Sequence, residues 1–214
     1  MMFASGLPGW FGKLPGMGDF AHRRLPESFR AQWDPWLQNG LMGLRQRHAD
    51  WTEHYLESPL WSFMLGEQVA GAARWIGVLM PSVDGVGRYF PFTLASEITV
   101  AQDMLRGAAL AQARRWWTLG ARAALDGLEH DLDPARFDAA LQRLFEPDAP
   151  DAPALPVRDE DVCQLPAAGQ SLWLTHPDGD AGWRMRSRGL PADERFDALF
   201  GFMTEASADK VEAA

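Results

Sequence analysis

The sequence has a single cysteine and no long hydrophobic run in its 214 residues. Because Cys163 is alone, no disulfide can form within the chain, and a reducing compartment is the expected environment. No stretch of about 18 apolar residues occurs, and no basic segment precedes an apolar one at the N-terminus. We therefore expect neither a membrane span nor a secretory signal, and predict a cytoplasmic protein.

Positive charge is also scarce, and the deficit is concentrated in the last third. The formal net charge is −9; residues 1–145 carry 14 basic against 15 acidic side chains, whereas residues 146–214 carry 6 against 14. An acidic surface repels phosphate backbones, so we expect no nucleic-acid partner. The hydrophobic fraction of 47% and the charged fraction of 23% are typical of an ordinary globular protein.

Recognisable catalytic, nucleotide-binding and metal-binding motifs are missing. Five residues, instead of the four of a P-loop, separate Gly6 from Gly12, and Pro26 interrupts any helix after the dinucleotide-like spacing of Gly16 to Ala21. No Gly-x-Ser-x-Gly elbow is present, and no two of the five histidines have helical ligand spacing. Cys163 follows an acidic segment, whose charge would raise the pKa of its thiol. We expect no cofactor and no metal.

The pattern of apolar residues predicts an α+β fold with a central, mainly antiparallel sheet flanked by helices, ending in a β-hairpin and a helix. The three strands from residue 60 to 98 have short connections, which favours a meander. Asp133-Pro134 is a typical helix start. Pro35 should end a short helical turn at 27–33, and a longer helix should begin at Pro35 itself. We expect strands at 10–14, 60–65, 75–80, 89–98, 171–175 and 183–187, and helices at 27–33, 35–48, 101–129 and 134–145, with a last one containing Phe196, Leu199, Phe200 and Met203.

Composition divides the chain into four parts. Residues 1–145 read as the main domain. Residues 146–168 begin with four regularly spaced prolines and six acidic side chains up to Asp161, which is typical of an extended linker or of a strap across the surface. Residues 169–205 hold the hairpin and helix expected to pack on the same domain, and residues 206–214 read as a frayed tail.

A shaped loop lies between two of the strands, at residues 81–92. Asp84-Gly85 is a strong turn dipeptide, and Arg88 lies close behind it. The strand that follows should place Phe90 and Phe92 on one face, while Pro91, which lacks an N–H, should put that strand at a sheet edge or turn its own position outward.

Two glycine-containing loops carry the candidate functional charges, which are Asp19 and Arg23 on the first and Asp84 and Arg88 on the second. One interpretation is a small-molecule hydrolase or transferase in which Asp19 or Asp84 is the base and Arg88 an electrostatic clamp. The other is structural: each aspartate caps its own turn and Arg88 pairs with one of them.

Several spaced motifs follow one another along the chain. They are Trp10-Phe11-Gly12-Lys13-Leu14-Pro15, Gly18-Asp19-Phe20, Arg24-Leu25-Pro26, Trp33-Asp34 with Trp36-Leu37, Pro59 with Trp61 and Phe63, Gly77-Val78 and Met80 to Pro91. Together they resemble the TagF (ImpM-type) accessory proteins of bacterial type VI secretion systems. The resemblance is close over residues 8–130 and looser at Ser171-Leu172-Trp173 and from Gly189 to Phe196.

The resemblance implies a non-catalytic cytoplasmic protein that represses assembly of the secretion machine after translation and acts through the system's forkhead-associated scaffold protein. Some relatives are fused to a phosphatase domain, for which this chain has no room. The resemblance also implies a longin-like or profilin-like sandwich, and it brings no catalytic residues. On this interpretation Asp19, Arg23, Asp84 and Arg88 are candidate partner-binding residues.

Overall fold

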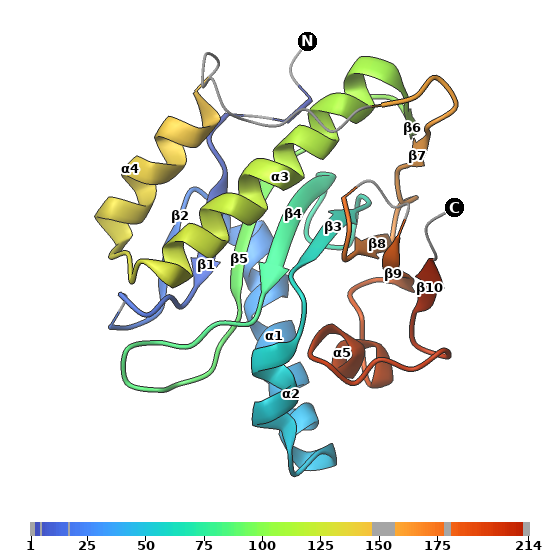
Figure 1. The fold of residues 1–214 in the computed structure, drawn as a ribbon. Helices are drawn as coiled ribbons and strands as arrows, with labels where there is room; N and C mark the ends of the chain where they lie inside the picture. Colours follow the sequence, from blue (N-terminus) through green and yellow to red (C-terminus); the bar gives the residue numbers. More distant parts are fainter. Residues whose placement is uncertain (1–2, 5, 17, 147–156, 178–180, 212–214) are drawn as a thin grey trace.

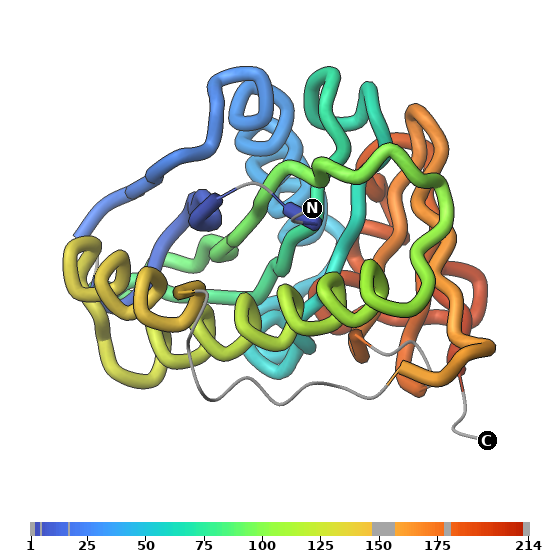
Figure 2. The backbone as a smooth tube through the Cα atoms, turned by 90° about the horizontal axis from the view of Figure 1, so that it is seen from above, coloured from blue at the N-terminus to red at the C-terminus, as the bar shows by residue number. Residues whose placement is uncertain are grey.

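An antiparallel sheet of eight strands lies between two layers of helices (Figures 1 and 2). The structure is a computed structural model that describes residues 3–4, 6–16, 18–146, 157–177 and 181–211. The strand order is β10-β9-β8-β3-β4-β5-β1-β2. The strands are β1 Gly9–Gly12, β2 Ala21–Arg23, β3 Trp61–Leu65, β4 Trp75–Met80, β5 Phe92–Glu97, β8 Gln170–Leu174, β9 Gly182–Arg188 and β10 Asp209–Val211, with a separate pair of β6 Met104–Leu105 and β7 Cys163–Gln164. The helices are α1 Glu27–Arg47, α2 Trp51–Glu57, α3 Gly107–Glu129, α4 Pro134–Phe145 and α5 Glu194–Leu199.

Both faces of the sheet are covered, so the core has two halves. Helices α3 and α4 pack on one face, and α1, α2 and α5 pack on the other. Strand β4 is buried at all six positions, with Ile76 and Val78 in the first half and Trp75 and Leu79 in the second. Burial on both faces explains why 75–80 is a continuous apolar run.

The predicted α+β architecture is confirmed, including the meander of β3, β4 and β5 and the hairpin of β8 and β9. The start of α4 is also as predicted: the carboxylate of Asp133 accepts hydrogen bonds from the N–H groups of Ala135 and Arg136, and Pro134 occupies the first turn. The meander, the hairpin and the start of α4 involve segments that are close together in the sequence, which is why the sequence pattern predicts them.

The predicted break at Pro35 is wrong, because α1 runs without interruption from Glu27 to Arg47. Phe29, Trp33 and Leu37 form one buried stripe against the sheet that continues on both sides of the proline. Burying this stripe contributes more free energy than the hydrogen bond that Pro35 cannot donate.

The strand predicted over 89–98 begins only at Phe92, and two expectations about it are wrong. Phe90 lies in the core half beside α1, where its ring contacts Phe11, whereas Phe92 lies in the opposite half. Strand β5 lies between β4 and β1, and Pro91 is buried, so Pro91 neither marks a sheet edge nor turns its own position outward. Pro91 instead precedes the strand, where no ladder hydrogen bond is required of it.

The C-terminal part of the chain enters the sheet beside β3. Strand β8 pairs with β3, and β9 and β10 extend the sheet to its edge. The frayed tail expected over 206–214 therefore differs from the structure at Asp209–Val211, which pairs with Gly182–Arg184. The final helix is also shorter than its apolar spacing suggests, since α5 ends at Leu199 and Met203 lies beyond it.

Of the acidic segment, the structure describes Glu146 and residues 157–168, and the four prolines lie outside the described residues. Asp161 is buried and pairs with Arg114 of α3, with 2.8 Å between carboxylate oxygen and guanidinium nitrogen. Two residues later, β7 pairs with β6. The end of this segment is thus held against α3.

Candidate functional site

The loop after β4 is closed by backbone hydrogen bonds from both sides. The N–H of Asp84 donates to the carbonyl of Arg88 at 3.1 Å, and the N–H of Phe90 donates to that of Ser82 at 3.1 Å. Between them, the N–H of Gly87 donates to the carbonyl of Asp84 at 2.9 Å, and Gly87 has a φ of 82°. The positive φ explains the glycine, and the predicted turn at Asp84 is confirmed.

The carboxylate of Asp84 is buried and accepts four hydrogen bonds. One oxygen accepts from the ammonium of Lys13 at 2.9 Å and from Nε of Arg88 at 2.7 Å; the other accepts from the N–H groups of Val86 at 3.1 Å and Arg88 at 2.9 Å. Burial by itself raises the pKa of Asp84, but these four donors outweigh it and hold the pKa well below its ordinary range. Asp84 is therefore a permanently charged anchor and a weak base.

The N-terminal loop is joined to this anchor at several points. Lys13 is buried, and its ammonium lies 4.5 Å from the ring centre of Phe20. Arg88 donates a second hydrogen bond, from Nη2 to the carbonyl of Gly18 at 2.8 Å. A Cβ on Gly85 would lie 2.8 Å from the carbonyl oxygen of Pro15. The two loops that carry the predicted charges are thus packed into one body, which we call the Asp84 knot and define as residues 13–16, 18–20 and 81–90.

Tyr55 of α2 fixes the base of the knot. Its hydroxyl donates to the carbonyl of Ser82 at 3.0 Å and accepts from the N–H of Ser82 at 3.0 Å. The side chain is fully buried, and this burial raises the pKa of Tyr55 far above its ordinary value. A neutral hydroxyl that both donates and accepts is what this pair of backbone groups requires.

Arg23 belongs to a different cluster, centred on Asp138 of α4. The carboxylate of Asp138 accepts from Arg23 at 2.9 Å, from both terminal nitrogens of Arg24, and from the indole N–H of Trp10 at 3.1 Å. The hydrogen bonds from Arg24 are the largest influence; together with those from Trp10 and Arg23 they outweigh burial and lower the pKa of Asp138 to about 2.

Of the four predicted site residues, the structure brings only Asp84 and Arg88 into direct contact. Asp19 lies at the exposed tip of the first loop, where its carboxylate accepts from the N–H of Phe20 at 2.8 Å. Sequence reasoning missed Lys13, the buried cation of the knot. The available signal was a lysine inside the apolar run from Trp10 to Leu14, because a buried ammonium requires a carboxylate partner.

The outer surface of the knot combines apolar side chains with charges. Val86 is 75% exposed and Phe20 is 48% exposed, which is high for side chains of this kind. Half of the Arg88 side chain is also exposed, and Asp19 lies next to Phe20. The outer surface of the knot therefore exposes two apolar side chains together with one positive and one negative charge.

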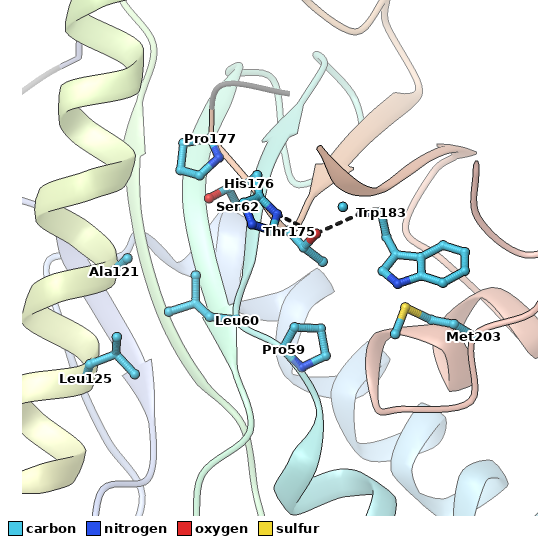
Figure 3. A pocket seen from close by; sticks show the side chains of 11 residues that line it. Pro59, Leu60, Ser62, Ala121, Leu125, Thr175, His176, Pro177, Trp183 and Met203 are labelled. Atoms are coloured by element: carbon cyan, nitrogen blue, oxygen red, sulfur yellow. Dashed lines mark hydrogen bonds between the residues drawn. The ribbon is translucent and has the colours of Figure 1, made fainter. Parts of the chain in front are cut away.

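A separate apolar pocket of about 530 Å³ lies between α3 and the β8–β9 hairpin (Figure 3). Leu60, Leu125, Trp183 and Met203 point into it, and Ser62 lies at its floor. Asp84 and Arg88 line neither this pocket nor three other hollows in the described part of the chain.

Three further observations concern metal ligands, the membrane and the single cysteine. Among residues 3–4, 6–16, 18–146, 157–177 and 181–211, no cluster of three or more histidine, cysteine or acidic side chains has the arrangement of a metal site. Within the same ranges, no helix has the length and apolar character needed to cross a bilayer. The thiol of Cys163 has a raised pKa, as predicted, but burial is the main cause, and nearby arginines oppose it.

The fold is thus an α+β fold, with an antiparallel sheet between two layers of helices and two charged loops joined at Asp84. A profile of the TagF N-terminal domain, described as type VI secretion system-associated, matches residues 9–144, and the chain belongs to this family. The resemblance noted in the sequence is thereby confirmed.

Among solved structures, the crystal structure of PA0076 from Pseudomonas aeruginosa PAO1 is similar, with 29% sequence identity and a TM-score of 0.65. The similarity covers 92% of this chain and 94% of that one, which extends beyond the 9–144 range of the family profile. A comparison with curated proteins gives no match.

Proposed function

We propose that this chain is a non-catalytic cytoplasmic accessory protein of a bacterial type VI secretion system. In this proposal it acts after translation as a negative regulator of assembly by binding another component, the forkhead-associated scaffold protein. The observation that carries the proposal is the family match over residues 9–144, whose description names the secretion system. The repressive role and the scaffold partner come from the resemblance described under "Sequence analysis".

The Asp84 knot is the proposed partner-binding surface. Asp84 itself is buried, so its role is to hold Val86 and Arg88 in one geometry by its four hydrogen bonds. Phe20 and Asp19 present the neighbouring contacts, since Phe20 packs against Phe90 with 4.6 Å between ring centres. A loop that is already ordered loses little conformational entropy on binding, which favours affinity.

The hydrolase or transferase alternative has less physical support. A general base needs a pKa near the working pH and a lone pair that faces a substrate. Asp84 has a low pKa, and both its oxygens are occupied by donors from Lys13, Val86 and Arg88. Asp19 is exposed and holds the adjacent backbone N–H. We therefore assign these residues to structure and recognition.

The test is a binding measurement between this chain and the purified forkhead-associated scaffold protein of the same secretion system. Val86→Asp places a charge at the exposed centre of the knot without removing a hydrogen-bonding side chain. We expect it to weaken binding by at least tenfold, because central apolar contacts dominate interface energies. Met42→Asp on α1, where the side chain is 54% exposed, is the matched control and should bind like the wild type.

Two results would overturn parts of the proposal separately. Equal binding by Val86→Asp and the wild type, with an unchanged circular dichroism spectrum, would remove the knot as the binding surface. Absence of binding by the wild type would remove the scaffold as the partner. In cells, excess wild-type protein should reduce assembly of the secretion apparatus, and excess Val86→Asp should not.

A further inference from the structure

Three arginine side chains surround one hollow at the end of β9. The hollow has a volume of about 620 Å³ and lies between β9 and the segment that leads into α5. Arg186, Arg188 and Arg195 line it, together with a single carboxylate, that of Asp193. In the part of the chain that the structure describes, no hydrogen bond or ion pair involves these three guanidinium groups. We call this place the arginine hollow.

This concentration of positive charge is unusual for the protein that carries it. Residues 146–214 contain 14 acidic and only 6 basic side chains, and four of the six lie between residues 184 and 195. Other arginines are satisfied internally: Arg47 pairs with Asp197 at 2.6 Å, and Arg74 pairs with Asp103 at 2.8 Å. The arginine hollow is therefore a local positive field available to an anionic group.

The backbone beside the hollow is an incomplete sheet edge. Strand β10 pairs only with Gly182–Arg184, although β9 continues to Arg188. Just before β10 the chain forms a turn, in which the N–H groups of Ser207 and Ala208 donate to the carbonyl of Thr204. Figure 1 shows β9 and β10 at the end of the sheet. Among the described residues, no strand pairs with residues 185–188 on the outer side of β9.

The register shows which groups this edge offers. The carbonyl of Trp183 accepts from Thr175, and the N–H of Gly189 donates to Gly169, so the odd-numbered residues direct their backbone groups toward β8. Backbone groups alternate along a strand, and those of Arg186 and Arg188 therefore point outward. The Arg188 carbonyl accepts from Oγ of Ser187 at 3.2 Å; no strand of the described residues pairs with Arg186 on that side.

We propose that this edge binds an extended acidic segment of a partner protein. The segment would add a short strand beside residues 185–188 and place its carboxylates against Arg186, Arg188 and Arg195. Addition of a strand to an open edge supplies backbone hydrogen bonds, and side chains at alternate positions supply the specificity. The planar guanidinium group suits this role, because it binds a carboxylate through two parallel hydrogen bonds.

The backbone of this edge favours a peptide over a nucleic acid. Its outward N–H and C=O groups alternate along the strand, which matches a peptide backbone and not a sugar-phosphate one. This inference is independent of the scaffold proposal, since it concerns the opposite end of the sheet from β1 and β2.

The test uses a fluorescent ten-residue peptide of alternating glutamate and valine and the full chain, at low salt, with binding followed by anisotropy. We expect Arg186→Glu/Arg188→Glu to weaken binding by at least tenfold, because attraction becomes repulsion at two positions. The matched control, Arg136→Glu/Arg143→Glu on exposed parts of α4, makes the same change in net charge and should bind like the wild type. A peptide with glutamine in place of glutamate should bind at least tenfold more weakly.

A second peptide tests the contribution of backbone hydrogen bonds. N-methylation of alternate residues of the acidic peptide should weaken binding by at least fivefold if a strand forms.

Lack of peptide binding by the wild type, or equal binding by both double variants, would overturn the proposal. Unchanged affinity of the methylated peptide would overturn the strand geometry. Tighter binding of a single-stranded DNA of equal charge, lost in Arg186→Glu/Arg188→Glu, would replace the peptide by a nucleic acid. If that variant is unfolded by circular dichroism, Arg186→Gln/Arg188→Gln serves instead, with the same criteria.

Discussion

The guanidinium of Arg88 donates to Asp84 and to the carbonyl of Gly18, whereas that of Arg186 has no hydrogen-bond or ion-pair partner in the described part of the chain. Both side chains lie at the surface. Arg88 belongs to a conspicuous turn motif, which makes it a candidate site residue from the sequence, whereas Arg186 lies in a strand without such a motif. An arginine in a recognisable motif can thus have its hydrogen bonds satisfied within the protein. An arginine without an internal partner is the one whose charge is available to bind another molecule.

The largest expected effect is the loss of the central carboxylate of the knot. Asp84→Ala should lower the free energy of unfolding by about 3–5 kcal/mol, because it leaves the buried ammonium of Lys13 and two backbone N–H groups without their acceptor. Urea denaturation at pH 7 measures it. Asp19→Ala, at an exposed position, should change the free energy by less than about 0.5 kcal/mol. A loss below about 1 kcal/mol for Asp84→Ala would contradict the assignment of Asp84 as an anchor.

Acid should weaken the ion pairs that Asp138 forms with Arg23 and Arg24. The pKa of Asp138 is lowered from 3.8 to about 2 in the folded protein, so its contribution is present above about pH 4 and is lost as the pH falls toward 2. We expect the wild type to exceed Asp138→Asn by about 2 kcal/mol in unfolding free energy at pH 7, since one pKa unit corresponds to about 1.4 kcal/mol. The gap should close near pH 2. Urea titrations between pH 2 and 7 give this dependence, and a gap independent of pH would contradict it.

Removal of the hydroxyl at the base of the knot should have a smaller effect. Tyr55→Phe leaves the backbone N–H and C=O of Ser82 without their partner, and we expect a loss of about 1–2 kcal/mol. Amide hydrogen exchange at Ser82 should accelerate. Tyr89→Phe is the control, because no hydrogen bond of the described residues involves its hydroxyl; it should behave like the wild type. Equal effects of the two substitutions would show that the ring, not the hydroxyl, matters.

The smallest effect compares the two arginines directly. Arg88→Ala removes two hydrogen bonds and should lower the unfolding free energy by about 1 kcal/mol, a value reduced by the exposure of the side chain. Arg186→Ala should remain within about 0.5 kcal/mol of the wild type. Thermal denaturation of the two variants is sufficient to rank their stabilities. An equal loss of stability in both variants would mean that Arg186 also stabilises the fold through internal interactions.

Features determined by neighbouring residues were predictable from the sequence. The meander from β3 to β5 follows from alternation and short connections, and α4 follows from the Asp133-Pro134 start. The turn at Asp84 is likewise local, because its carboxylate accepts from residues two and four positions later. In these places local preference and tertiary structure agree.

Features determined by distant residues were not predictable. Lys13 and Asp84 are 71 positions apart, and the sequence contains no pattern that joins them. Phe90 departs from the expected alternation because the chain is not yet a strand at that position, and its ring packs with Phe11. The continuity of α1 through Pro35 reflects burial of its apolar stripe, which outweighs a local preference.

The pairing of β8 with β3 has a consequence for synthesis of the protein. On the ribosome, β3 has only β4 as a neighbour until Ser171 has been made, 106 residues after its partner Leu65. All five residues of β3 are buried in the finished fold, and a bare apolar strand edge readily recruits strands from other chains. Translation thus passes through an interval in which the nascent chain is exposed to misassembly, and the arrival of residues 170–174 ends it.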